Sequence, residues 1–157
     1  MFKLSDEGMT FVKKELQRYE TKSSAIIPAL FRAQAENGGY ITPEVIDHLS
    51  TVMELPVADI HRVFTFYSMF NKKPVGKYHI QVCCNISCAM NGGRELADHI
   101  LEKLRVKEGE VTGDGLYSLS RVECLGSCGT APMMQINDEY YESLTGESAM
   151  DIIRGLK

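Results

Sequence analysis

The chain has 157 residues, of which 44% are hydrophobic and 24% are charged, and its net charge is −4. This is ordinary globular composition, and the length suffices for one moderate domain or two small ones. The negative charge argues against a general binder of nucleic acid or another polyanion. The longest apolar stretches fall far short of the roughly 18 residues that a membrane-spanning helix needs, so we expect no direct membrane contact.

The N-terminal sequence MFKLSDEGMTFVKKELQ is acidic at first and then amphipathic, which is not typical of a secretory signal. We therefore expect a cytoplasmic location, where thiols stay reduced. The five cysteines, an odd number, also fit a disulfide framework poorly, and all of them follow residue 74. The polar segment NKKPVG (71–76) is broken by Pro and Gly. It predicts a domain boundary between 1–74 and 75–157.

Residues 1–74 are predicted to form a small bundle of consecutive helices. Ser5 is a good N-cap for the first, with two acidic residues in the first turn. The second follows residues 23–24 and stops at the glycine pair 38–39. Thr42 caps the third helix, and the fourth follows Pro56 and runs to about Phe70.

The third and fourth predicted helices also have the outline of a DNA-binding helix-turn-helix. The would-be recognition helix, VADIHRVFTFYSMF, offers a single arginine, Arg62, whereas phosphate contacts need several basic side chains. We therefore expect no nucleic-acid partner, and interpret the aromatic residues of this helix as core or as a docking surface. His48 and His61 lack a convincing second metal ligand one turn away, so we expect them to be structural or surface residues.

In residues 75–157 the pattern of apolar residues changes and predicts strands and amphipathic helices. The order β, α, β, β, β, α predicts a compact open α/β sandwich, and with the bundle an α+β fold. The predicted elements are strand 77–83, a helix from about 93, strands 116–124 and 131–136, a fourth strand through 140–141, and helix 147–154.

The cysteines form two clusters: Cys83 or Cys84 with Cys88, and Cys124 with Cys128. Each begins at the predicted end of a strand and runs into a loop that contains glycine. The sheet holds strand ends rigidly, and glycine lets backbone N–H groups approach sulfur. Four thiolates presented in this way suit zinc or an iron–sulfur cluster.

Strand alternation distinguishes the two adjacent cysteines. Cys84 falls in phase with Ile80 and Val82, which we take as facing the core, whereas Cys83 falls in phase with His79. The pattern therefore predicts Cys83 as the ligand and Cys84 as a small core residue with an inert thiol.

The spacing leaves several interpretations open. The gaps of three or four residues favour a [2Fe–2S] cluster over a zinc ribbon, which usually has two-residue gaps. A stand-alone binding module with structural zinc remains the main alternative. A redox dithiol would need Cys-x-x-Cys, which is absent, and merely buried thiols would not explain two clusters at two strand ends.

The segments Cys83-x4-Cys88 and CLGSCGTAPM (124–133) resemble the thioredoxin-like [2Fe–2S] ferredoxin family, and within it the NuoE type found in NADH:quinone oxidoreductase, respiratory complex I. The similarity extends to segments 39–41, 64–70 and 109–112, so it covers nearly the whole chain. The resemblance implies an N-terminal helical bundle (1–74) and a thioredoxin-like domain (75–157) that carries one [2Fe–2S] cluster. It also implies four iron ligands, Cys83, Cys88, Cys124 and Cys128.

The same resemblance implies a partner, the flavin- and NADH-binding subunit, whose FMN passes one electron to the cluster. No FMN or nicotinamide motif is visible in this chain, so we expect no catalytic residue and no catalysis from the chain alone. The implied location is the peripheral arm of a complex at the inner face of the cell membrane. Similar subunits serve NAD-linked [FeFe] hydrogenases and formate dehydrogenases, and the sequence does not separate these parent complexes.

Overall fold

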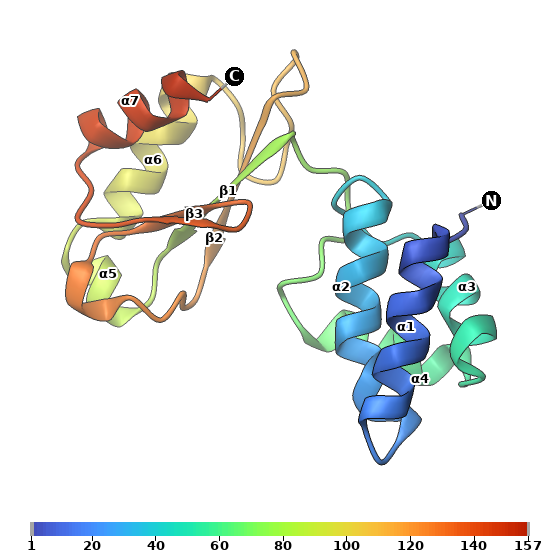
Figure 1. Cartoon of the computed structure of the whole chain (residues 1–157). Coiled ribbons are helices and arrows are strands. Elements are labelled where there is room, and N and C mark those ends of the chain that lie inside the picture. Colours follow the sequence, from blue (N-terminus) through green and yellow to red (C-terminus); the bar gives the residue numbers. More distant parts are fainter. Residues whose placement is uncertain (1, 157) are drawn as a thin grey trace. The chain divides into compact units, whose positions relative to one another are not determined.

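The computed structural model describes residues 2–156, and the chain divides between residues 74 and 75 into two compact units. The first unit consists of helices and the second of a mixed sheet with helices, which confirms the predicted fold class (Figure 1). Within residues 2–156, no helix combines the length and the hydropathy needed to cross a membrane.

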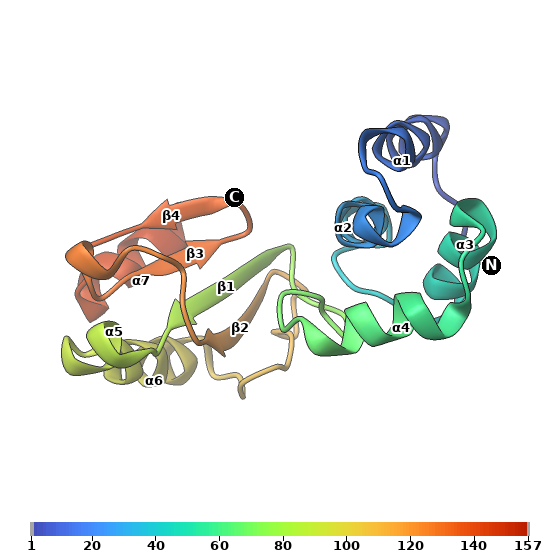
Figure 2. The ribbon, with the colours of Figure 1, turned by 90° about the horizontal axis from the view of Figure 1, so that it is seen from below.

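The first unit packs four α-helices and one 3-10 turn around an apolar core (Figures 1 and 2). The helix that Thr42 caps buries four apolar residues in this core: Val45, Ile46, Leu49 and Met53. The elements are α1 (Asp6–Arg18), η1 (Lys22–Ala25), α2 (Ile26–Glu36), α3 (Pro43–Met53) and α4 (Val57–Phe66).

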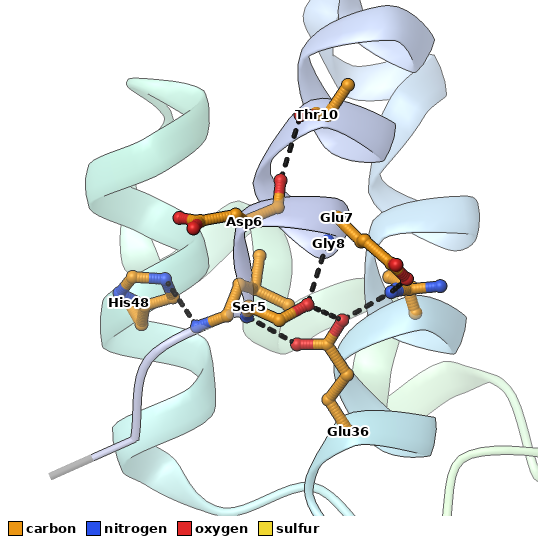
Figure 3. Close-up of polar contacts among 9 residues, drawn as sticks. Ser5, Asp6, Glu7, Gly8, Thr10, Glu36 and His48 are labelled. Atoms are coloured by element: carbon orange, nitrogen blue, oxygen red, sulfur yellow. Dashed lines mark hydrogen bonds and ion pairs between the residues drawn. The ribbon is translucent and has the colours of Figure 1, made fainter.

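The start of α1 is held by the two neighbouring helices (Figure 3). Ser5 is the predicted N-cap, and its hydroxyl accepts the N–H of Gly8 at 3.0 Å. Glu36 of α2 accepts both the backbone N–H and the hydroxyl of Ser5, each at 2.7 Å. Gly8 makes room for this carboxylate, because a Cβ there would lie 2.4 Å from Glu36 Oε1. From α3, His48 Nε2 accepts the N–H of Leu4 at 3.2 Å, so His48 is part of the fold.

The predicted end of α4 is wrong by four residues, since the helix ends at Phe66 rather than Phe70. Tyr67 adopts extended backbone after the last helical turn. Asn71 draws the chain away from the axis of α4 through two hydrogen bonds. Its backbone N–H donates to Gln34 Oε1 of α2 at 2.8 Å, and its side-chain amide donates to the carbonyl oxygen of Gly39, in the loop after α2, at 2.8 Å. Phe70 still reaches the core.

The second unit is a four-stranded sheet in the order β2-β1-β3-β4. β1 is parallel to β2 and antiparallel to β3, and β3 pairs with β4 as a hairpin. The elements are β1 (Tyr78–Cys83), α5 (Ile86–Met90), α6 (Gly93–Leu104), β2 (Tyr117–Val122), η2 (Cys128–Thr130), β3 (Met134–Ile136), β4 (Glu139–Tyr141) and α7 (Gly146–Gly155).

α6 and α7 cover one face of this sheet (Figures 1 and 2). Ile80 and Val82 of β1 contribute to the core beneath them, as their alternation predicts. The predicted order of strands and long helices is confirmed, but β2 and β3 are shorter than expected and α5 was not predicted. α5 has only five residues, too few to show a helical period, and the side chain of Asn85 caps it by accepting the N–H of Ile86 at 2.7 Å.

Candidate metal centre

The end of β1 and the middle of α5 bring two thiols together. Cys83 and Cys88 are both buried, and with Met133 they form a small apolar cluster separate from the core beneath α6 and α7. Both thiols belong to this cluster, and the Cys83 sulfur also lies 3.5 Å from the carbonyl oxygen of Glu123. The structure therefore places two of the four predicted ligands side by side.

A glycine allows the chain between these two thiols to fold so tightly. Gly93, the first residue of α6, is buried against the backbone of both cysteines. A Cβ at this position would lie 2.6 Å from the carbonyl oxygen of Cys83 and 2.9 Å from that of Cys88. Real side chains do not approach backbone so closely, so only glycine fits without moving the two cysteines.

Cys84 lies on the other side of the chain from Cys83. It packs against the core that contains Ile80 and Val82, with its sulfur 3.9 Å from the carbonyl oxygen of Gly93. Its N–H donates to Val122 at 2.8 Å, so strand pairing continues one residue past the end of β1. The alternation that predicts different roles for the two cysteines is therefore maintained here. Cys84 is half-buried rather than fully buried, and burial raises the pKa of its thiol.

The other two predicted ligands, Cys124 and Cys128, are exposed in the loop between β2 and β3. The N–H of Gly126 donates to the Cys124 sulfur at 3.4 Å, the kind of contact that we expected from the glycine-containing loops. The hydroxyls of Ser87 and Ser127 hold the loops. Ser87 donates to the carbonyl oxygen of Cys128 at 3.1 Å, which joins the two cysteine loops.

The electrostatics of Cys88 reflect this crowding. Burial and the neighbouring thiols of Cys83 and Cys128 together raise the pKa of Cys88 to about 11, although a hydrogen bond from the Met133 backbone opposes them. A metal that binds here must displace the proton, and the resulting thiolate then has the metal as its counter-charge.

The donor set fits a [2Fe–2S] cluster. Within residues 2–156, no three His, Cys, Asp or Glu side chains gather closely enough to hold one ion. A two-iron cluster takes four thiolates but only two at each iron, and the two loops offer two cysteines each. The N–H of Gly126, which donates to the Cys124 sulfur, stabilises negative charge there.

Two residues that the sequence analysis missed hold the loop of Cys124 and Cys128 in place. The Tyr140 hydroxyl donates to the carbonyl oxygen of Leu125 at 2.8 Å, and Glu142 accepts hydrogen bonds from the same loop. The sequence predicts the hairpin that carries both residues, but not its register against the loop. With its turn at residues 137–138, β4 returns alongside β3 to the place where the cysteine loop ends.

Comparison with known proteins places this chain in a family. The sequence model of the thioredoxin-like [2Fe–2S] ferredoxin family matches residues 12–157. The chain belongs to this family. The family that the two cysteine segments resemble is thus confirmed, and so is the [2Fe–2S] cluster as the family's cofactor.

Within the family, this ferredoxin chain is similar to subunits of NADH-quinone oxidoreductase. It is 42% identical to the NuoE subunit of that enzyme from Rickettsia bellii, over 99% of this chain and 95% of the relative. It is 41% identical to NADH-quinone oxidoreductase subunit 2 of Thermus thermophilus, over 97% of this chain and 85% of the relative. A chain of the NAD+-reducing [NiFe]-hydrogenase in its air-oxidized state shares the fold, with a TM-score of 0.66 and 22% identity. That match covers 80% of this ferredoxin chain and 22% of the hydrogenase chain.

Proposed function

We propose that this chain is the NuoE-type electron-transfer subunit of an NADH:quinone oxidoreductase, and that it accepts one electron from the FMN of a partner subunit that binds NADH. The observation that carries this proposal is the meeting of two cysteine loops across the Ser87–Cys128 hydrogen bond, in a chain 42% identical to such a subunit over nearly its whole length. The proposed iron ligands are Cys83, Cys88, Cys124 and Cys128.

The residues of the site suit this task. When bound, a [2Fe–2S] cluster supplies one-electron exchange. Cys83 and Cys88 would bind the cluster as the buried pair of thiols, with Met133 excluding water beside them. Cys124 and Cys128 would bind it from the exposed loop, where a partner's flavin can approach. The chain's own part is to bind, shield and position, so we assign it no catalytic residue.

The surface around the exposed cysteines suits a permanent partner. Segments 84–93 and 124–134 contain no charged residue, in a chain that is 24% charged. On α5, Ile86 and Met90 lie one turn apart and are 76% and 83% exposed. Interface cores are depleted in charge and enriched in methionine. We call this face the α5 patch (Ile86 and Met90), and we infer that the flavin-binding subunit covers it. We also infer that the complex lies at the inner face of the cell membrane.

The aromatic residues of the first unit offer a second, less well supported contact surface for the complex. Phe64 and Phe70 are buried, as a core role requires, but Phe66 is 78% exposed and its ring packs edge-on against Tyr67. These two exposed rings are available to the same complex.

The test is spectroscopic. Purified chain should contain equal amounts of iron and acid-labile sulfide, and after dithionite reduction it should give a rhombic S = 1/2 EPR signal. NADH should reduce it only when the flavin-binding subunit is present. A colourless protein loaded with zinc would overturn the proposal in favour of a structural-zinc module.

The alternative parent complexes are an NAD-linked hydrogenase and a formate dehydrogenase. The match to the hydrogenase chain, at 22% identity, carries the fold alone, whereas the relatives at 41–42% identity are subunits of NADH-quinone oxidoreductase. Affinity purification from the native cell decides between them by the enzyme that accompanies the chain.

A further inference from the structure

Glu142, the residue after β4, is bound to the loop that carries the two exposed cysteines. One of its carboxylate oxygens, Oε1, accepts the hydroxyl of Thr130 at 2.8 Å and also that of Ser127. The two hydroxyls are themselves 2.7 Å apart. One carboxylate thus binds two side chains that flank Cys128.

Backbone contacts hold the same stretch of the hairpin against the end of this loop. The N–H of Ser143 donates to the carbonyl oxygen of Thr130 at 2.8 Å, and the N–H of Leu144 donates to that of Pro132 at 2.9 Å. β4 pairs with β3 in fixed register, with Tyr141 opposite Met134. The position of Glu142 is therefore set by the sheet, whereas the loop it binds has only the short turn η2 of its own.

We propose that Glu142 is a positioning residue for the iron–sulfur site: it fixes the loop that presents Cys124 and Cys128, and it keeps a negative charge beside that loop. The proposal rests on the proposed function, because it takes these two cysteines as ligands. Glu142 contacts no sulfur, so it acts through Ser127 and Thr130.

The two parts of this role have separable consequences. Without the carboxylate, the loop loses two charge-assisted hydrogen bonds and opens more often, which exposes iron to solvent. If only the charge of Glu142 is removed, the cluster becomes easier to reduce, because residue 142 no longer repels the added electron. The hydrogen bonds that Glu142 accepts hold the pKa of its carboxyl below the usual range, so the charge is present at neutral pH.

Two substitutions at this position separate the effects, in the full-length chain with its cluster. Glu142→Ala removes hydrogen bonds and charge, and the cluster should bleach about tenfold faster in excess EDTA, since hydrogen bonds to a charged group contribute enough for a factor of ten. Glu142→Gln retains an acceptor for both hydroxyls, so it should bleach within about twofold of the wild type. Its midpoint potential, from an EPR-monitored titration at low salt, should be higher.

Glu139 provides the matched control, because it is an exposed carboxylate on the same hairpin and lies about 10 Å along the strand from residue 142. Glu139→Ala and Glu139→Gln should keep the wild-type bleaching rate, with a smaller rise in potential. Equal bleaching of Glu142→Ala and wild type would overturn the positioning role, and a potential of Glu142→Gln no higher than that of Glu139→Gln would overturn the charge role. If Glu142→Ala purifies without iron while Glu139→Ala keeps it and both have wild-type circular dichroism, the positioning role is supported.

The wild type separates this inference from the proposed function. Wild-type chain without iron and sulfide would refute the proposed function. Wild type with a normal cluster, combined with variants that do not differ from it, would refute only the role of Glu142.

Discussion

At the scale of single residues, the adjacent cysteines give the sharpest test. Cys84→Ala should retain iron, sulfide and the EPR signal, because its side chain packs on the core beneath α6 rather than beside Cys88. Cys83→Ala should lose or strongly alter the signal, because it removes a proposed iron ligand that lies in the same buried cluster as Cys88. Iron analysis and EPR of both variants check this. Loss of the cluster in Cys84→Ala, with retention in Cys83→Ala, would mean that the ligand assignment is off by one.

Gly93 is the second residue whose role can be tested alone. Gly93→Ala should lower the free energy of unfolding by about 1–3 kcal/mol, the usual cost of overpacking, because its Cβ would meet two carbonyl oxygens that cannot move without moving Cys83 and Cys88. Urea denaturation of the chain measures this. Gly113→Ala is the control, since a Cβ there meets no atom within 4 Å, and its effect should stay within about 0.5 kcal/mol. Equal stability of the two variants would show that the backbone around Gly93 is free to adjust.

At the scale of helices and strands, the sequence predicts those elements whose ends carry a chemical signal. Ser5 and Thr42 cap α1 and α3 as expected, because a hydroxyl next to an apolar period marks a helix start. The end of α4 and the whole of α5 were missed for the opposite reason. The first depends on Asn71 contacts with residues far away in sequence, and the second is too short to have a period.

The candidate site likewise has residues that the sequence predicts and residues that it misses. The strand pattern predicts the different sides taken by Cys83 and Cys84, because a strand alternates whatever surrounds it. It cannot find Glu142, whose contacts depend on the register of a hairpin and on a loop 12–15 residues earlier. Side chains that hold a loop become visible only when the sheet places them.

The start of α1 predicts a dependence of stability on pH. His48 Nε2 must be neutral to accept the Leu4 N–H, and burial, with the charge of Lys3, holds the pKa of His48 below its usual value. Glu44, one turn earlier on α3, accepts the N–H of Phe2 at 3.1 Å. Below pH about 6.5, where a histidine in the unfolded chain gains a proton, the unfolded state binds more protons than the folded state. Stability therefore falls as pH falls.

The comparison with His48→Gln measures this contribution. Glutamine can accept the same N–H but does not titrate, so the variant should lose less stability than the wild type between pH 7.5 and 5.5. Burial also lowers the pKa of His79, but that group is present in both proteins and cancels in the difference. Parallel pH profiles from urea denaturation would show that His48 is not the titrating group.

At the scale of the whole molecule, the distribution of charged and uncharged surface predicts which face a partner covers. Its cysteine loops contain no charge, while charged residues are common elsewhere. Such a neutral face costs little to dehydrate when a partner covers it, and a nearby redox centre gains a drier environment. In the proposed complex, the α5 patch would therefore be the part of this surface that the partner dehydrates.

Met90→Lys tests that role of the patch. A lysine in place of a side chain that is 83% exposed should leave the fold and the EPR signal of the isolated chain unchanged. In the complex, the lysine charge would lose its water without gaining an opposite charge. The Kd for the flavin-binding subunit should therefore rise at least about tenfold, since 1.4 kcal/mol corresponds to that factor. Met90→Leu keeps an apolar side chain at the same place and should bind as the wild type does. Titration calorimetry with the purified partner measures both, and tight binding of Met90→Lys would place the partner on another face of the chain.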